Sequence, residues 1–201
     1  MALDAALRYS AGTSGRGSPF HSLGRMKTIT VTGYLVQSKL ESAIREIVGE
    51  SSWMGREVKL PDSKRRWDMA YESHGRTVVV EFDGDEHYRN TLKFKIDEEK
   101  DADAKKHGVR VVRIPYWIQL TTETLAHYFQ LSAEVVQNFP HGFIETKIFP
   151  ASYCEMGVRR FQREYAALPS GVQVAVLESL CAMATEHGAK YVLPAFLRHA
   201  A

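Results

Sequence analysis

The chain has 201 residues, of which 44% are hydrophobic and 25% charged, as in a globular protein with one domain or one domain plus a helical extension. A formal net charge of +2 is too small to indicate a nucleic-acid partner, so such a partner must be argued from local clusters of charge. The two cysteines, Cys154 and Cys181, give no CxxC or zinc spacing, no apolar run approaches the roughly 18 residues of a membrane span, and no secretion signal is evident, so we expect a reduced, cytoplasmic protein.

Residues 1–25 are predicted to form a flexible tail outside the fold, because their second half is rich in Gly and Ser. Met26 could be the natural start of the protein. A helix is predicted over residues 37–50, where the apolar residues recur at helical spacing. Ser38 and Glu41 fit a capping box, in which Ser38 is the N-cap and Glu41 reaches back to its amide.

The segment of residues 56–66 is basic. Its cationic side chains are Arg56, Lys59, Lys64, Arg65 and Arg66. A run of charge is usually a solvated loop, but this one directly precedes two strands that carry acids. Contact with the phosphates of a nucleic acid is therefore a second interpretation of the segment.

A β-hairpin is predicted over residues 67–83, with turn residues at its centre. One face of its first strand carries the apolar side chains Trp67, Met69 and Tyr71. If residues 73–76 form the loop, Asp68 on the other face lies directly opposite Glu81. Two facing carboxylates repel each other unless a cation lies between them, so this pairing predicts a metal site.

The second hairpin strand ends in acids. Alternation places Val78, Val80 and Phe82 on one face. On the other face Glu81 and Asp83 project side by side, and Gly84 permits a turn that could bring His87 back toward them. Burying charge costs several kcal/mol unless it is paired or bound to a cation, so we expect the active site here.

A helix is predicted over residues 92–107, ending at Gly108, and a strand rich in β-branched residues over 109–115. The order strand, helix, strand gives a βαβ crossover, in which the two strands pair in parallel. The last third is predicted to be mostly helical, with helices over residues 121–131, 158–168 and 172–187. We therefore expect an α/β core over residues 26–120 and a helical extension over residues 121–201.

The candidate site residues form an oxygen-rich set with one imidazole and no thiolate. Asp68, Glu81 and Asp83, with His87 nearby, suit Mg²⁺, or Mn²⁺ as its substitute, better than zinc. A carboxylate-bound divalent ion can activate water and neutralise charge on a phosphoryl group, and histidine suits general-base work near neutral pH. Phosphodiester hydrolysis also explains basic residues around an acidic centre. The candidate nucleic-acid contacts are Lys59, Lys64, Arg65, Arg66, Arg89 and Lys93.

The order and spacing of these pieces resemble the Vsr-like, EDxHD branch of the PD-(D/E)XK nucleases. This branch includes the very-short-patch-repair endonuclease and the EDxHD homing endonucleases. The matching pieces, within about residues 36–118, are Glu41, Asp68, the E-x-D-G-x-x-H run Glu81–His87, the helix motif Asp97–Asp101, and the stretch Gly108–Arg113. The sequence departs from the pattern at Asp83, which stands where the E-x-K lysine is expected, and it has no counterpart of the repair enzymes' zinc ligands. Pro61-Asp62 imitates the "PD" but falls in a loop, so Asp68 is preferred.

The resemblance implies a restriction-endonuclease-like α/β core of αβββαβ type, with a helix, a β-hairpin, a crossover helix and a strand in a mixed sheet. It also implies Mg²⁺-dependent cleavage or nicking of DNA. Asp68 would be the principal metal ligand, Glu81 and Asp83 would support it, and His87 would be the base. Asp97 would orient His87 or a metal-bound water, and Glu41 would reach the site from the first helix.

Simpler interpretations stay open for several of these residues. The capping box alone explains Glu41. Asp97 and Asp101 could form exposed pairs with lysines of their own helix. A lone His87 would ordinarily be a hydrogen-bonded surface residue.

The leading hypothesis is a metal-dependent DNA endonuclease or nickase serving repair, mobile elements or defence. The alternative is a nuclease-like fold kept as a DNA-binding or assembly subunit without catalysis, which the missing lysine favours. A third is an acid-rich metal-binding protein without affinity for nucleic acid, against which the run Lys64–Arg66 argues. The preference for DNA over RNA and the assembly of the chain as a monomer, a homodimer or a larger complex stay open.

Overall fold

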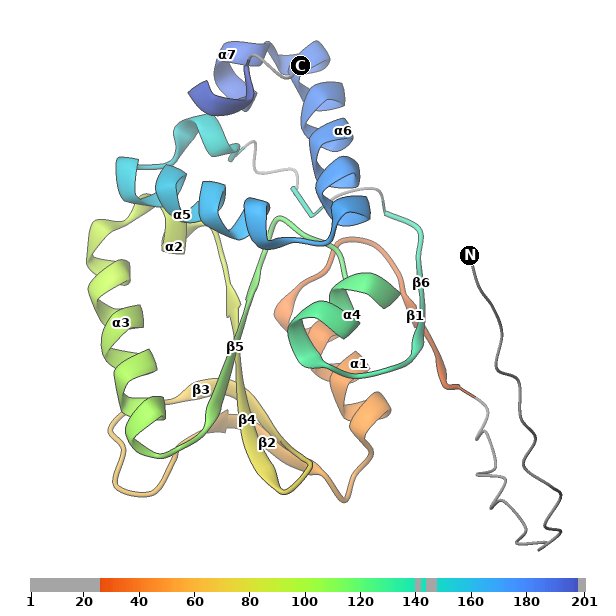
Figure 1. The fold of residues 1–201 in the computed structure, drawn as a ribbon, viewed down its shortest axis with the longest axis vertical. Helices are drawn as coiled ribbons and strands as arrows, with labels where there is room; N and C mark the ends of the chain where they lie inside the picture. The colour runs from red at the N-terminus through yellow and green to blue at the C-terminus, as the bar shows by residue number, and fades with distance from the viewer. Residues whose placement is uncertain (1–25, 140–141, 144–147, 199–201) are drawn as a thin grey trace, which may run out of the picture.

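The computed structural model describes residues 26–139, 142–143 and 148–198, and the tail predicted over residues 1–25 lies outside them. At its centre is a four-stranded mixed sheet in the order β2-β3-β4-β5 (Figure 1). The strands are β2 (Trp53–Val58), β3 (Trp67–Ser73), β4 (Arg76–Asp83) and β5 (Arg110–Pro115). β2, β3 and β4 are antiparallel neighbours, whereas β4 and β5 are parallel, as predicted for the crossover.

The predicted hairpin is confirmed as β3 and β4. His74 and Gly75 form its turn, and both have positive φ (52° and 70°), the conformation of a type I′ turn that matches the twist of the strands. The register pairs Met69 with Val80, and its continuation places Asp68 opposite Glu81. The backbone N–H of Asp68 donates to the Glu81 carboxylate (3.3 Å), so the predicted cross-strand pair is confirmed.

The two faces of the sheet are covered by different helices. A large hydrophobic cluster joins one face to α1, α4 and the C-terminal helices, and Met69, Tyr71 and the valines of β4 at 78 and 80 belong to it. A smaller cluster joins the other face to α3, and it contains Trp67, Ala70 and Ala104. The prediction that Trp67 shares a face with Met69 and Tyr71 is therefore wrong. The pairing of β3 with β4 begins at Met69, and before it the Asp68 side chain accepts the Phe82 N–H (2.8 Å) in place of a main-chain bond.

The predicted first helix is α1 (Gln37–Val48), but its predicted cap is wrong. Val36 is the N-cap residue, in an extended conformation, and no side chain caps the helix. Glu41 instead forms an ion pair with Arg56 (2.9 Å), which lies in β2 rather than in the predicted basic loop. A residue on the neighbouring strand thus takes the carboxylate that the capping box would have used.

Two helices separate β4 from β5. The short helix α2 (Glu86–Arg89) follows β4, where the sequence had suggested only a turn. α3 (Thr91–Lys106) begins after Asn90, whose side chain accepts the N–H of Leu92 (3.0 Å), and it precedes Gly108 with a φ of 66°. The predicted helix over residues 92–107 is confirmed.

The C-terminal part is mostly helical, as predicted. The helices are α4 (Thr122–Phe129), α5 (Glu155–Ala167), α6 (Ser170–His187) and α7 (Ala189–Val192), with 3-10 turns at Pro150–Ser152 and Ala195–Leu197. Two short strands that the sequence did not predict, β1 (Thr28–Val31) and β6 (Glu134–Gln137), pair in parallel. Across the described part of the chain, no helix combines the length and hydrophobicity needed to cross a membrane.

Helix α5 lies across the end of the sheet where β4 and β5 finish, next to α2 (Figure 1). The close approach depends on Gly157. A Cβ at this position would lie 1.8 Å from the carbonyl oxygen of Tyr88, which also accepts the N–H of Cys154 (3.1 Å). The absence of a side chain at residue 157 therefore allows α5 to pack directly on α2.

Gly157→Ala should destabilise the protein by about 2 kcal/mol or more, because a methyl group there collides with backbone rather than with a flexible side chain. The measurement is the free energy of unfolding from urea titration. Gly171→Ala in α6 is the matched control, since its Cβ would meet only the end of the Glu123 side chain at 3.0 Å. Equal stability of the two variants would contradict the packing argument.

Candidate functional site

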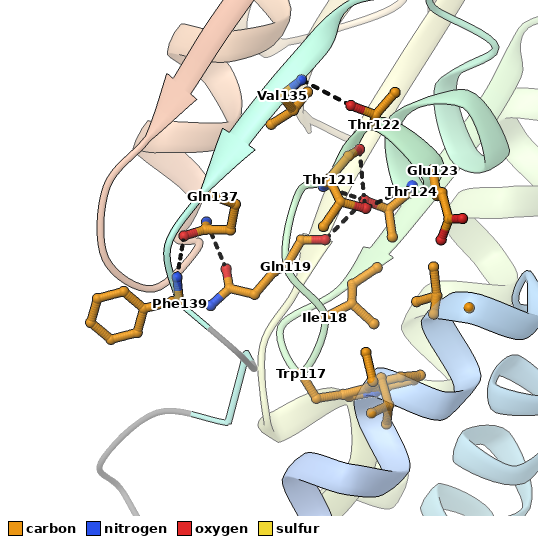
Figure 2. Close-up of a pocket in the computed structure, with 14 residues that line it drawn as sticks. Trp117, Ile118, Gln119, Thr121, Thr122, Glu123, Thr124, Val135, Gln137 and Phe139 are labelled. Atoms are coloured by element: carbon orange, nitrogen blue, oxygen red, sulfur yellow. Dashed lines mark hydrogen bonds between the residues drawn. The ribbon is translucent and has the colours of Figure 1, made fainter.

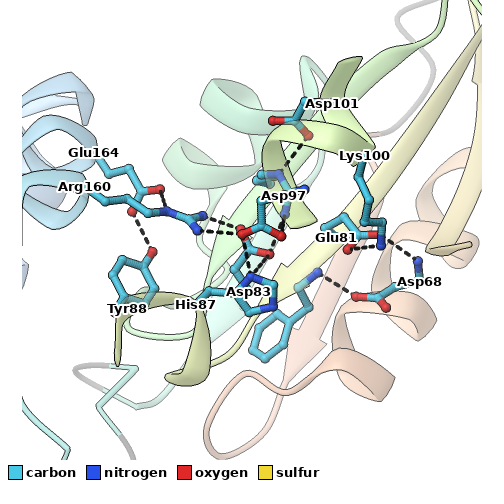
Figure 3. Close-up of polar contacts among 12 residues, drawn as sticks. Asp68, Glu81, Asp83, His87, Tyr88, Asp97, Lys100, Asp101, Arg160 and Glu164 are labelled. Atoms are coloured by element: carbon cyan, nitrogen blue, oxygen red, sulfur yellow. Dashed lines mark hydrogen bonds and ion pairs between the residues drawn. The ribbon is translucent and has the colours of Figure 1, made fainter. Parts of the chain in front are cut away.

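Charged side chains from β3, β4, α2, α3, β5 and α5 meet at the end of the sheet (Figure 3). They form two adjoining sets. The Asp68 group consists of Asp68, Glu81 and Lys100. The Asp83 group consists of Asp83, His87, Asp97, Arg113 and Arg160.

In the Asp68 group, a lysine from α3 bridges to the end of β4. The Nζ atom of Lys100 lies 2.6 Å from each carboxylate oxygen of Glu81. Glu81 is buried, and Asp68 is half-buried beside it. Lys100 thus pairs with Glu81, while the Asp68 carboxylate accepts the Phe82 N–H (2.8 Å).

The Asp68 group is short of positive charge. Burial raises the pKa of Glu81 from its usual 4.5 to about 7, although Lys100 opposes that rise. Burial also raises the pKa of Asp68, against the lowering effect of the Phe82 N–H and of Lys100. Repulsion from Asp68 adds to the rise in the pKa of Glu81, and repulsion from Asp83 adds to the rise in the pKa of Asp68.

In the Asp83 group, two guanidinium groups bind two aspartates. Asp83 is completely buried, and its Oδ1 lies 2.8 Å from Nη1 of Arg113 while its Oδ2 accepts from Nη2 of Arg160. Asp97 has the same two neighbours, with Arg113 at 3.3 Å and Arg160 at 3.2 Å. Within these four residues two positive charges balance two negative ones, although Arg113 also pairs with Asp101 (3.0 Å) and Arg160 with Glu164 (2.7 Å).

His87 is held by this balanced pair. Its Nδ1 lies 2.7 Å from Oδ2 of Asp97 and 3.4 Å from Oδ1 of Asp83. A carboxylate at Nδ1 favours the tautomer with its proton there, which leaves Nε2 able to accept a proton. Burial alone would raise the pKa of Asp97, but the His87 hydrogen bond and the two arginines lower it further than burial raises it. The expected contact between His87 and Asp97 is confirmed.

The two groups differ in how well they suit a metal ion. Ligand atoms of Asp83, His87 and Asp97 lie within 4.8 Å of one another, a spacing that could hold a metal ion. The same carboxylates, however, already bind two arginines. The carboxylate oxygens of Asp68 and Glu81 are hard ligands that suit Mg²⁺. The cationic side chain that contacts this pair is Lys100, through Glu81. The predicted metal ligands Asp68, Glu81 and Asp83 are thus divided between the two groups.

Glu41 lies in neither group. In the described ranges, its only ion pair or hydrogen bond through the carboxylate is the one with Arg56. The expectation that Glu41 reaches the site therefore has no contact to support it. The helices that contribute to the site are α2, α3 and α5 rather than α1.

The candidate nucleic-acid contacts lie at two places. Lys59, Lys64 and Arg66 are exposed in the segment before β3, and Arg65 fastens this segment to α3 through an ion pair with Glu99. Arg89 in α2 is exposed and pairs with Asp85 (3.1 Å), and half-buried Lys93 follows in α3.

Three residues of the site were missed by sequence reasoning. Arg113 could have been found, because parallel pairing of β4 with β5 places it beside Glu81 in the register. Lys100 belongs to the quoted helix motif but was assigned only to surface pairs. Arg160 carried no signal, since it lies 77 residues after Asp83 in a helix of the extension.

A pocket lies away from these two groups. A cavity of about 300 Å³ opens between the start of α4, β6 and the start of α6 (Figure 2). Its walls combine apolar side chains such as Ile118, Val135 and Val176 with threonines of α4. No candidate catalytic residue lines it.

In comparisons with known proteins, no protein-family model, curated protein or solved structure matches this chain.

Glu81→Gln should weaken the pH dependence of stability between about pH 4.5 and pH 7. The raised pKa of Glu81 means that the folded state holds a proton that the unfolded state has released in this window. The free energy of unfolding of the unmodified protein should therefore fall as pH rises through this window. Glu81 should contribute roughly 2–3 kcal/mol to that fall. Urea unfolding in chelator across the window measures the slope.

Glu72→Gln, an exposed change on the same hairpin, is the control and should keep the slope of the unmodified protein. An unchanged slope in Glu81→Gln would show that another group binds the proton.

Proposed function

We propose that the protein is a metal-dependent DNA endonuclease or nickase that hydrolyses phosphodiester bonds. The observation that carries the proposal is the Asp68 group, in which Asp68 on β3 lies opposite Glu81 on β4 and Lys100 forms an ion pair with Glu81. Such a pair is costly to bury without a further cation. A divalent ion is the cation that would make this arrangement useful.

The metal would be Mg²⁺, with Mn²⁺ as its substitute, held by Asp68 and Glu81. When bound, it would supply a Lewis acid for the phosphoryl oxygens and lower the pKa of a water molecule. The E-x-K pattern places a lysine where this sequence has Asp83. Lys100 could do that lysine's work, because its ammonium reaches the Glu81 carboxylate from α3. His87, oriented by Asp97, can take a proton at Nε2.

The chain order also supports the proposal. A helix, three strands, a helix and a strand follow one another as α1, β2, β3, β4, α3 and β5, with the short α2 between β4 and α3. This is the αβββαβ order implied by the resemblance to Vsr-like, EDxHD nucleases. The exposed Lys59, Lys64 and Arg66 would hold the phosphate backbone, since their segment is fastened to the helix that carries Lys100.

One observation favours a second candidate, a DNA-binding or assembly subunit without catalysis. Glu81, Asp83 and Asp97 each have a basic partner already, in Lys100 or in the two arginines. Carboxylates paired in this way can serve as structural links. The two candidates are separated by whether the protein cuts DNA.

Asp68→Asn should reduce nicking of supercoiled plasmid in Mg²⁺ or Mn²⁺ by at least about 100-fold, because it removes one of two proposed metal ligands. Asp62→Asn is the matched control. Asp62 stands in the Pro61-Asp62 pair that imitates the "PD" pattern, but it lies exposed in the loop before β3. It should cut like the unmodified protein. Cleavage that survives Asp68→Asn or chelator would refute the mechanism, and binding without any cleavage would establish the second candidate.

Lys64→Ala should weaken DNA binding and lower the slope of log K against log salt by about 1, the effect of losing one phosphate contact. Fluorescence anisotropy over a salt series in chelator measures both quantities. Arg45→Ala is the control, because Arg45 lies exposed on α1 and pairs with Glu50. Equal slopes for Lys64→Ala and the unmodified protein would place the DNA elsewhere.

A further inference from the structure

Arg160 enters the Asp83 group from α5, outside the predicted nuclease core. Its two terminal nitrogens are divided between two acids, because Nη2 binds Oδ2 of Asp83 and Nη1 lies 3.2 Å from Oδ2 of Asp97. Oδ2 of Asp97 also contacts His87. The guanidinium therefore lies between ligand atoms of the group that could otherwise hold a metal ion.

Arg160 is itself firmly held. Its Nε donates to Glu164 (2.7 Å), and its guanidinium carbon lies 4.8 Å from the ring centroid of Tyr88. The hydroxyl of Tyr88 donates to the same glutamate (2.6 Å), as Figure 3 shows. Only 6% of Arg160 is exposed, so its charge depends on these partners.

We propose that Arg160 replaces a divalent ion in the Asp83 group and is a positioning residue for His87. The inference deepens the proposed function and rests on it for the ion at the Asp68 group. With Arg113 on one side and Arg160 on the other, both oxygens of Asp83 and Oδ2 of Asp97 already contact a guanidinium, so a metal ion would have to displace an arginine. An ion binds at the Asp68 group alone, and α5 holds the His87–Asp97 contact in place of a second ion.

Solvent reaches one side of the Asp83 group. A hollow of about 190 Å³ between α3 and α5 reaches Asp97, Arg113 and Arg160, but Asp83 and His87 do not line it. The exclusion follows from the carboxylate oxygens that the arginines occupy and from the rigid fork of the guanidinium, which matches two carboxylate oxygens at once.

The test is Mn²⁺ titration calorimetry on full-length variants. The unmodified protein and Arg159→Gln, an exposed neighbour on α5 paired with Glu155, should bind one ion per chain. Arg160→Gln should bind one ion more, and the double variant with Asp83→Asn should lose it. Arg160→Lys, which keeps the charge, should return the count to one. Two ions in the unmodified protein, or no additional ion in folded Arg160→Gln, would overturn the inference.

Arg160→Gln could fail to fold, because it leaves buried Asp83 with one arginine. In that case the test is the NMR signal of the side-chain Nε–H of Arg160 in the unmodified protein. It should keep its chemical shift and its protection from exchange in saturating Mg²⁺, and a shift of that signal to the solvent-exposed position would overturn the inference. Failure of the proposed function is distinguishable: an additional ion in Arg160→Gln without any ion in the unmodified protein would refute only the Asp68 site.

Discussion

The structure depends on the neutralisation of one fully buried carboxylate. Asp83 ends β4 with no exposed surface, and leaving such a group without a partner would cost about 3–5 kcal/mol. Arg113 comes from the adjacent strand and Arg160 from α5, so a single acid joins the sheet to the C-terminal helices. The extension predicted over residues 121–201 thus contributes a side chain to the site through Arg160.

The two neighbouring charge groups differ in their electrostatics. Arg113 and Arg160 contact Asp83 and Asp97, and also Asp101 and Glu164, and the pKa of Asp97 is lowered. In the Asp68 group Lys100 pairs with Glu81, and burial raises the pKa values of both Glu81 and Asp68. Direct contacts with arginine therefore stabilise the charged acids of one group, whereas burial disfavours the charge on the acids of the other.

Local sequence patterns predicted the structure correctly where no distant contact competed with them. Strand alternation and the hairpin register placed Asp68 opposite Glu81, and the βαβ order gave the parallel pairing of β5. They failed where tertiary contacts took over. Arg56 took Glu41 away from its expected cap, and Trp67, which precedes the pairing of β3 with β4, lies on the other face. The basic partners of the acids come from elements distant in the sequence. No local pattern predicts that the helix containing residue 160 will pack against the end of the strand that finishes at residue 83.

That separation along the chain has a consequence for biosynthesis. Asp83 leaves the ribosome 77 residues before Arg160, which at about 5–20 residues per second is roughly 4–15 seconds. During this interval Arg113 emerges and can pair with Asp83, but the second arginine is still missing. Parallel pairing of β1 with β6 likewise waits until the chain has passed residue 137. The complete Asp83 group can therefore form only after residue 160 has been made.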